Sequence, residues 1–588
     1  MKKQTDSGYL AVSILALGLC AYSFAQSGAT TPQTAEQTTA ASQQSADKKA
    51  ASQETPGTVY KSPAVLKANS RLVIVDVVAT NKNDEPITDL QPKDFTVLED
   101  GKPQQVRSFS FQQPVAVDVK PGAKPTPRRP LPANVVTNIP EYKSEGSLNV
   151  VLLDSVNTMT LDQITARDQA LKVLEQLPPG RATAVYALSD KLHALHDFTT
   201  DLDELKNAVT GFAIQNSVFL NNPTNGPEIE YVHPSLKYTA DIAAENWTES
   251  RSLFTLDALN SLARALAGYP GRKNLIWISA GFPMMLNPVD RNFSAAVERT
   301  ANLLSNSQIA VYPVDARGAA TSKALQAQNG KGGYTGPGLM AKLSQEAAEL
   351  LNAHNTMNAL AEMTGGRAFY NRNELGKAIA KCMDDGSTYY TLGYYPVNKK
   401  WNGKFRKITL ELDRPDIKLR YRTGYLAEDS TSYQKQSDKQ HAQDLGQALS
   451  LDFPISTALM FQAGILPSSA KTHNKIVVNY LLDAHQIGFE REDDGFQHAT
   501  LDYAIQVYSE KGEALKTDVT SIETAFPADA FNQVMKTGFL YQKTLNLPPG
   551  NYILRLGIRD SRTGLIGTGT GRITMAAQTA NQNHAPQR

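Results

Sequence analysis

The sequence contains very little cysteine. Among its 588 residues only Cys20 and Cys382 carry a thiol, and Cys20 lies in a segment that we expect to be removed from the mature protein. One remaining cysteine cannot form an internal disulfide, so the folded domains must be held together by their apolar cores. A chain of this length predicts about three or four domains, each large enough to bury such a core.

The chain also lacks an excess of charge and the common catalytic motifs. It has 59 Lys and Arg against 58 Asp and Glu, a net charge of +1, which gives no reason to expect nucleic acid as a partner. It contains no Gly-x-Ser-x-Gly and no His-Glu-x-x-His, and the glycine-rich stretch 330–338 lacks the Gly-Lys-Ser/Thr that cradles phosphate. A non-enzymatic protein is therefore expected, and a hydrolase is the least favoured class.

Only one long apolar run is present, and it lies at the N-terminus. Residues 9–22 follow Lys2 and Lys3 and precede Ser-Phe-Ala at 23–25, the pattern of a secretory signal peptide over 1–25. The run is shorter than the ~20 residues that a membrane span needs, although a retained anchor or a lipid on Cys20 is an alternative. We predict export to the periplasm, cell surface or medium, with no membrane span after cleavage.

The parts of the chain outside its centre read as linkers and β modules. Residues 26–67 are rich in Ser, Thr, Ala and Gln and predict a disordered linker. β-branched runs and turn signals predict β structure in three segments, and proline-rich or polar stretches predict linkers between them. The expected order is an N-terminal β module at 68–112, a Pro-rich linker at 113–147, a β meander at 387–427, a linker at 428–447, a β-sandwich at 448–578 and a tail at 579–588. Neither 68–112 nor 387–427 has much core alone, so they are expected to pair into one sandwich.

The centre of the chain, 148–386, alternates short apolar runs with helical patterns. This alternation predicts a Rossmann-like α/β domain, a mostly parallel sheet with helices on both faces. The run at 148–153 ends on Asp154 and is followed by a helical pattern. Ligands of such sheets bind beyond the carboxyl ends of the strands, where Asp154 and Thr158 are expected. Two further strands at 182–188 and 192–198 are joined closely enough to be antiparallel, and Thr255 is expected to cap a helix.

Several of these stretches resemble a von Willebrand factor A domain. The matching segments are 148–159, 198–205, 255–283, 309–318 and 360–370, and the flanks at 94–102 and 421–425 resemble the bacterial VWFA-related family of exported proteins. Such domains commonly carry a metal-ion-dependent adhesion site. There an Asp-x-Ser-x-Ser loop, a Thr from a second loop and an Asp from a third hold one divalent cation.

Carried over to this chain, the motif is incomplete. Asp154, Thr158 and Thr255 match ligand positions, whereas Val156 and Ala280 stand where a Ser and an Asp are expected. Mg²⁺ and Ca²⁺ both need hard oxygen ligands, so two interpretations stay open. Either the degenerate site holds Mg²⁺ or Ca²⁺ with help from Ser155, Asn157 or Asp257, or Asp154 and Thr158 stabilise the start of the helix and partners bind without metal.

The resemblance implies an exported protein that binds a protein, an extracellular matrix component or an envelope component at the top of its sheet. The alternative is a structural envelope protein whose metal-independent von Willebrand factor A core only spaces other domains. The missing oxygens at Val156 and Ala280 favour that alternative.

Overall fold

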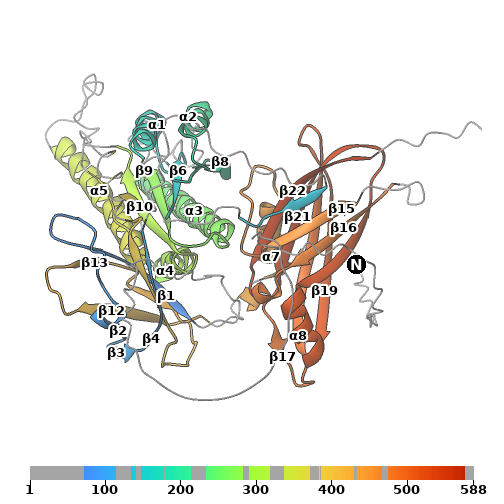
Figure 1. Cartoon of the computed structure of the whole chain (residues 1–588). Helices are drawn as coiled ribbons and strands as arrows, with labels where there is room; N and C mark the ends of the chain where they lie inside the picture. The colour runs from blue at the N-terminus through green and yellow to red at the C-terminus, as the bar shows by residue number, and fades with distance from the viewer. Residues whose placement is uncertain are drawn as a thin grey trace, which may run out of the picture. The chain divides into compact units, whose positions relative to one another are not determined.

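The computed structural model describes most of the chain from Leu72 to Met575 (Figure 1). The described residues are 72–113, 134–140, 147–177, 180–213, 234–281, 291–317, 337–370, 376, 380, 383–384, 386–428, 433–435, 437–466 and 474–575. The predicted signal peptide at 1–25, the linker at 26–67, the tail at 579–588 and both cysteines lie outside these ranges.

The centre of the chain forms a five-stranded, mostly parallel sheet of order β10-β9-β6-β7-β8. Its strands are β6 (Leu148–Asp154), β7 (Thr183–Leu188), β8 (Leu192–Thr199), β9 (Lys273–Ser279) and β10 (Ile309–Asp315). β6 pairs in parallel with both β7 and β9, β9 pairs in parallel with β10, and β8 runs antiparallel to β7. The predicted fold class is thereby confirmed, including the antiparallel pair.

Helices cover both faces of this sheet. They are α1 (Thr160–Glu175), α2 (Leu202–Gly211), α3 (Pro234–Leu266), α4 (Arg291–Asn306) and α5 (Pro337–Thr364). Along β6, Val150 and Leu152 pack into a core with α3 and α4, whereas Val151 and Leu153 pack into a second core with α1 and α2. Since successive strand residues face opposite sides, the unbroken apolar run of β6 is what a doubly covered strand requires.

Two helices are longer than the sequence indicated. α3 begins at Pro234, so Thr255, expected as its cap, lies in its middle and donates a hydrogen bond to the Arg251 carbonyl. α5 begins at Pro337, whereas the sequence pattern predicts a helix only over 354–363, after a loop-rich insertion. Neither N-terminal extension was expected from the sequence.

The segments before and after the α/β domain share two sheets. Sheet β13-β1-β11-β4 and sheet β14-β12-β2-β3 each combine strands from both segments. Their bounds are β1 (Val73–Thr80), β2 (Phe95–Glu99), β3 (Lys102–Gln104), β4 (Val106–Gln112), β11 (Tyr389–Tyr394), β12 (Phe405–Leu412), β13 (Lys418–Arg420) and β14 (Gly424–Leu426). β1 pairs with β11, β2 pairs with β12, and one apolar core joins the two sheets. We call this unit the composite module.

The C-terminal part is a second sandwich, with sheets β20-β16-β15-β5 and β17-β18-β21-β22, and with β19 paired to β18. Its bounds are β15 (Phe461–Leu466), β16 (Lys475–Leu482), β17 (Glu490–Arg491), β18 (Gln497–Ser509), β19 (Ala514–Phe526), α8 (Ala528–Thr537), β20 (Phe539–Asn546), β21 (Gly550–Asp560) and β22 (Ile566–Met575). Both sheets contribute to one core, in which Tyr480 and Tyr503 are fully buried.

The expected linkers contain regular structure. β5 (Val135–Thr137) lies in the predicted Pro-rich linker yet pairs with β15 of the C-terminal sandwich. α7 (Asp438–Ala448) lies in the predicted linker 428–447 and is capped by the Ser437 side chain, which accepts from the Gln440 N–H. A strand of three residues is too short to show an alternating pattern in the sequence. β5 can therefore be recognised only from its pairing with β15.

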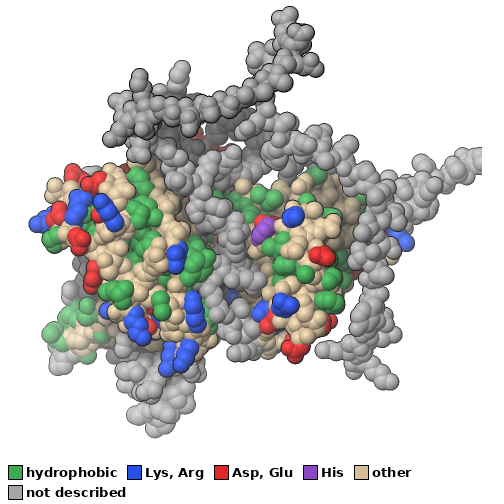
Figure 2. All heavy atoms as spheres, turned by 60° about the horizontal axis from the view of Figure 1, so that its bottom comes forward, with side chains coloured by type: hydrophobic (Ala, Val, Ile, Leu, Met, Phe, Trp, Pro, Cys, Tyr) green, Lys and Arg blue, Asp and Glu red, His purple; other side chains and the backbone are tan. Residues whose placement is uncertain are grey.

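The surface is mixed in character. On the face shown in Figure 2, described acidic, basic and hydrophobic side chains are interspersed among neutral ones. Within the described ranges, every helix is too short or too polar to cross a bilayer.

Candidate functional site

The three predicted ligand residues meet at the carboxyl edge of the parallel strands. We call this edge the crest and define it by residues 154–158, 279–281 and 315–317, together with the adjoining start of α1 at 159–164 and the neighbouring part of α3. Asp154 ends the central strand β6, Thr158 follows in the loop to α1, and Thr255 comes from α3. Their exposed fractions are 2%, 0% and 0%, so this group of side chains is buried beneath the crest.

Asp154 is saturated with hydrogen-bond donors. Its Oδ1 accepts from the backbone N–H groups of Val156 and Asn157, each at 3.0 Å. Its Oδ2 accepts from Asn157 Nδ2 at 2.8 Å, Trp277 Nε1 at 3.0 Å and Ser279 Oγ at 2.8 Å. A carboxylate offers about four lone-pair positions, so five donors leave no position free for another ligand.

The Asn157 amide connects two of the predicted ligands. Its Nδ2 donates to Asp154 Oδ2 and, at 2.8 Å, to Thr255 Oγ1. The orientation of the amide follows from chemistry, because its carbonyl oxygen would repel the carboxylate. That carbonyl oxygen is buried and has no hydrogen-bond partner among the described residues. An N–H₂ group thus stands between the two oxygens that a cation would have to share.

The remaining motif positions contribute no oxygen toward this point. Thr158 Oγ1 accepts a hydrogen bond from the Ala280 N–H at 3.2 Å, which joins the first loop to the third. Val156 is buried in the core on the α3 side of the sheet. Neither Asp154 nor Thr158 is the N-cap of α1, because that position is Met159, which makes no side-chain cap bond. Asp154 stabilises the loop before the helix.

Two ionisable groups at this site, Asp154 and Arg251, have shifted pKa values. Burial raises the pKa of the Asp154 carboxyl, and the hydrogen bonds from Asn157, Ser279 and Trp277 lower it. Burial also lowers the pKa of Arg251, one turn before Thr255 on α3, while the negative charges of Asp154 and Glu349 raise it. The negative charge of Asp154 thus acts on Arg251, whereas the hydrogen bonds from neutral groups are what favour the charged form of Asp154.

A divalent cation does not fit this arrangement. Mg²⁺ and Ca²⁺ need six or more oxygens around one point, but here an amide nitrogen occupies the point and the carboxylate is fully engaged. Asp257 was considered above as a substitute metal ligand. Burial raises the pKa of its carboxyl, the positive charge of Arg264 lowers it, and the negative charge of Asp444 raises it. In the described ranges, no three His, Cys, Asp or Glu side chains are grouped to hold a metal.

A second buried polar cluster lies on the same edge and was not predicted. Asp315 ends β10 and accepts a two-pronged hydrogen bond from Arg317, at 2.9 and 2.8 Å, and a third from His354 Nε2 of α5 at 2.9 Å. The His354 ring stacks on Tyr370, with centroids 4.0 Å apart. Burial alone would raise the pKa of Asp315, but the bonds from His354 and Arg317 hold it below its usual value. The signal available in sequence was a second acid at the end of a parallel strand.

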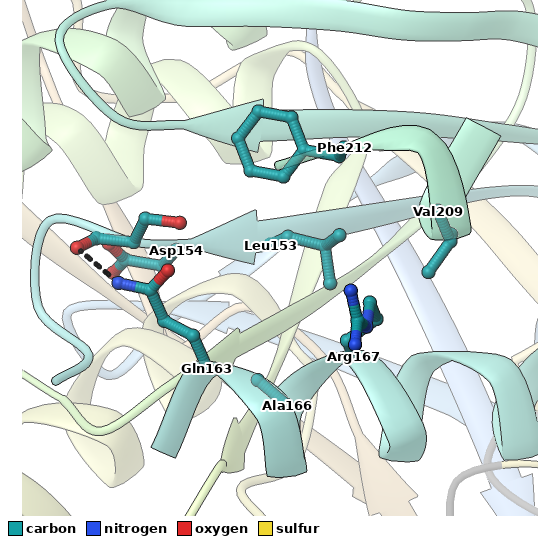
Figure 3. A pocket seen from close by; sticks show the side chains of 8 residues that line it. Leu153, Asp154, Gln163, Ala166, Arg167, Val209 and Phe212 are labelled. Carbon is teal, nitrogen blue, oxygen red and sulfur yellow. Dashed lines mark hydrogen bonds between the residues drawn. The ribbon is translucent and has the colours of Figure 1, made fainter. Parts of the chain in front are cut away.

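A small pocket lies on the other face of β6, between α1 and α2 (Figure 3). It has a volume of about 20 Å³, enough for one water molecule, and far below the volume of a substrate pocket. Gln163 of α1 reaches back over its mouth and donates to the carbonyls of Thr158 at 2.9 Å and Ser155 at 3.4 Å. This pocket therefore offers no room for a substrate beside Asp154.

Comparison with models of protein families finds no match, and comparison with curated proteins finds none. Among solved structures, the chain is similar to an aerotolerance-related membrane protein from Bacteroides fragilis, with 13% identity, a TM-score of 0.25, and coverage of 41% of this chain and 99% of that one. It is also similar to a von Willebrand factor type A protein from Catenulispora acidiphila, with 9% identity, a TM-score of 0.21, and coverage of 81% and 75%. The ArnB paralog VWA2 from Sulfolobus acidocaldarius shows 9% identity, a TM-score of 0.20, and coverage of 86% and 76%.

Sequence identities and TM-scores this low do not indicate what the chain binds. The sheet order and the placement of Asp154 at the end of the central strand agree with the von Willebrand factor A-like domain that the sequence predicted for 148–386. The amide of Asn157 lies at the centre of this crest.

Proposed function

We propose that the protein is exported, is not an enzyme, and binds a protein partner at its crest without a divalent cation. The observation that carries this proposal is the bridge from Asn157 Nδ2 to Asp154 and Thr255, which takes the place of a cation. A partner carboxylate would find no metal to coordinate there. The contact would have to draw its free energy from apolar burial and neutral hydrogen bonds.

Apolar side chains are available at this position. Leu161 and Ile164 lie three residues apart at the start of α1, on one side of the helix, with exposed fractions of 77% and 41%. Met159, just before them, is 44% exposed. Large apolar residues that are grouped on the surface mark an interaction surface more often than scattered ones do. Each Å² of apolar area that a partner removes from water contributes about 25 cal/mol to the free energy of binding.

Export rests on the pattern of residues 1–25, which lie outside the described residues. Lys2 and Lys3, the apolar run and the small residues near Ala25 support it. The partner would then be an envelope or extracellular protein. A non-enzymatic role is supported by the absence of a nucleophile and base pair beside a pocket in the described part of the crest.

The test is capture of envelope proteins by the full mature chain, with and without a chelator. We expect capture of a defined partner to survive the chelator. The double variant Leu161→Asp/Ile164→Asp should weaken capture about tenfold or more, since charge would replace apolar area at the centre of the contact. Leu540→Asp is the matched control, because Leu540 is 71% exposed but lies on β20 of the C-terminal sandwich.

Release of the partner by the chelator would contradict the metal-independent proposal. Equal capture by wild type and the Leu161→Asp/Ile164→Asp variant would remove the crest as the binding surface. That outcome would support the second candidate, a structural envelope component whose α/β domain is a spacer, which Val156 and Ala280 favour because they lack the oxygens of a working metal site.

A further inference from the structure

A hollow of about 390 Å³ lies at one end of the C-terminal sandwich, beside the end of β18 and the paired strands β21 and β22. Pockets that hold small molecules commonly have volumes of about 300 to 1,000 Å³, so this hollow is large enough for a ligand. We call it the sandwich-end hollow. The polar residues that line it include Asn134, Glu510, Asn551, Arg572 and Thr574.

Strand pairing places opposite charges on two sides of this hollow. Arg572 of β22 lies opposite Ile553 of β21, and Glu510 directly follows β18, which pairs with the other edge of β21. Since neighbouring strands lie about 4.8 Å apart, the backbones that carry these two charges are separated by roughly 10 Å across β21. The carboxylate and the guanidinium therefore approach the hollow from opposite sides.

Both charges lack a partner within the described part of the chain. The Glu510 and Arg572 side chains are exposed, and neither forms an ion pair or a side-chain hydrogen bond with another described residue. Two other arginines of the same sheet are engaged, because Arg559 donates to Asp502 at 2.9 Å and Arg555 donates to backbone carbonyls. Two opposite charges that face one hollow without meeting are available to a ligand.

The wall between the charges adds a neutral donor and an apolar surface. Thr574 Oγ1 donates to Asn551 Oδ1 at 2.9 Å, so both N–H hydrogens of the Asn551 amide remain for another acceptor. Ile553 lies two residues further along the same strand, is 9% exposed and also lines the hollow. A fitting ligand thus carries a cation, a carbonyl oxygen and an anion, with small apolar groups between them.

We propose that the sandwich-end hollow binds a short peptide with free termini, of about two residues. The ammonium of the peptide pairs with Glu510, its carboxylate pairs with Arg572, and its central carbonyl accepts from Asn551 Nδ2. Two extended residues span about 7 Å, and the two side chains reach inward over the rest of the roughly 10 Å between their strands. A guanidinium and a carboxylate can form two parallel hydrogen bonds. A ligand with one charge or none would leave a charge of the hollow unpaired.

The experiment measures the binding of two dipeptides to the full mature chain by saturation-transfer NMR, which observes the signals of the peptide. Ala-Ala carries both terminal charges, and N-acetyl-Ala-Ala-amide has the same two residues without those charges. Charge-assisted hydrogen bonds are about twice as strong as neutral ones. We therefore expect saturable binding of Ala-Ala and an affinity about tenfold weaker, or less, for the blocked peptide. Equal binding of the two peptides, or no saturable binding of Ala-Ala, would overturn the proposal.

Variants of the two charged walls test which groups hold the termini. Glu510→Gln and Arg572→Gln should each weaken Ala-Ala binding about tenfold, whereas Glu523→Gln, at an exposed carboxylate on β19, should leave it unchanged. The double variant Glu510→Arg/Arg572→Glu should recover binding, because a zwitterion can lie in the hollow in the opposite direction. Thermal unfolding checks that each variant is folded. Unchanged binding in both single variants, or a loss that the exchanged pair does not reverse, would overturn the proposal.

Discussion

The side-chain amide of Asn157 donates a hydrogen bond to the carboxylate of Asp154 across 2.8 Å. The same nitrogen donates to Thr255, so one neutral group holds together the first and second loops of the crest. In a metal-dependent crest a cation would do this, and its removal would leave two buried oxygens unpaired. Here the link is covalently part of the chain, so the crest keeps its geometry without any ion.

The first prediction concerns Asp154. Asp154→Ala should lower the free energy of unfolding of the α/β domain by about 3 to 5 kcal/mol, because it leaves buried donors, among them Trp277 Nε1, without an acceptor. Calorimetric unfolding of wild type and variant measures the difference. Asp493→Asn, at an exposed turn, is the control and should change the value by less than about 0.5 kcal/mol. A loss as small as that of the control would show that Asp154 is not the centre of the network.

The second prediction concerns Asn157. Asn157→Asp replaces the donor with a carboxylate that faces Asp154, so like charges meet in a buried site and stability should fall by about 2 to 4 kcal/mol without metal. The same change creates a cluster of oxygens from residues 154, 157 and 255. Added Mg²⁺ or Ca²⁺ should therefore restore stability in this variant and leave wild type unchanged.

Thermal unfolding of the variant measures this effect. It is followed with and without about 5 mM cation, a concentration on the order that weak sites need. Asn157→Leu is the control, because it removes the amide without adding an oxygen and should gain nothing from metal. Stabilisation of the wild-type chain by the cation to the same extent as the variant would contradict the role given to the amide.

The third prediction concerns pH and Lys273. Burial lowers the pKa of Lys273 from 10.5 to about 7, while the charge of Asp76 raises it, and Nζ donates to the Tyr269 carbonyl at 2.6 Å. Between those two pH values the unfolded chain binds a proton that the folded chain does not, so the free energy of unfolding should rise with pH across this window. Below about 7 both states are protonated, and the full cost of the buried charge is present.

Lys273→Met removes the titrating group. The variant should gain stability relative to wild type at pH 6 and lose that advantage toward pH 10, with a difference on the order of 4 kcal/mol across the window. Urea unfolding at several pH values checks this. Parallel pH profiles for the two proteins would show that Lys273 is not neutral in the folded state.

The fourth prediction concerns the composite module. Arg406 and Glu99 form a buried ion pair at 3.2 Å between β12 and β2, and the hydroxyls of Tyr394 and Tyr425 donate to the same carboxylate. Arg406→Ala should cost about 3 to 5 kcal/mol because a buried charge is left unpaired. Hydrogen exchange of β1, β2, β11 and β12 should accelerate together. Acceleration confined to residues on one side of the α/β domain in sequence would contradict a shared module.

Much of the fold could be predicted because its signals are local. The apolar run of β6, the helical periods of α1 and α2, and the short connection between β7 and β8 each lie within one stretch of sequence. β5 could not be predicted, because three residues carry no period and its partner β15 lies more than 300 positions away.

The residues of the candidate site were predicted, but their contacts were not. Asp154, Thr158 and Thr255 do lie close together beneath the crest, yet spacing cannot show which partner fills each lone pair. The decisive residue was Asn157, considered only as a substitute oxygen ligand, whereas its nitrogen faces Asp154. The donors Trp277 and Ser279 follow from the parallel register of β6 and β9, since Leu152 lies opposite Trp277 and alternate residues share a face.

The most direct test of a cation-free crest is isothermal titration calorimetry of the full mature chain with Mg²⁺, Mn²⁺ and Ca²⁺, beside Asp154→Ala. The geometry predicts no saturable binding heat attributable to Asp154 at cation concentrations up to about 1 mM. Titrations of wild type and variant should then coincide. Saturable binding by wild type that disappears in Asp154→Ala would show that a cation displaces the Asn157 amide and would contradict the account.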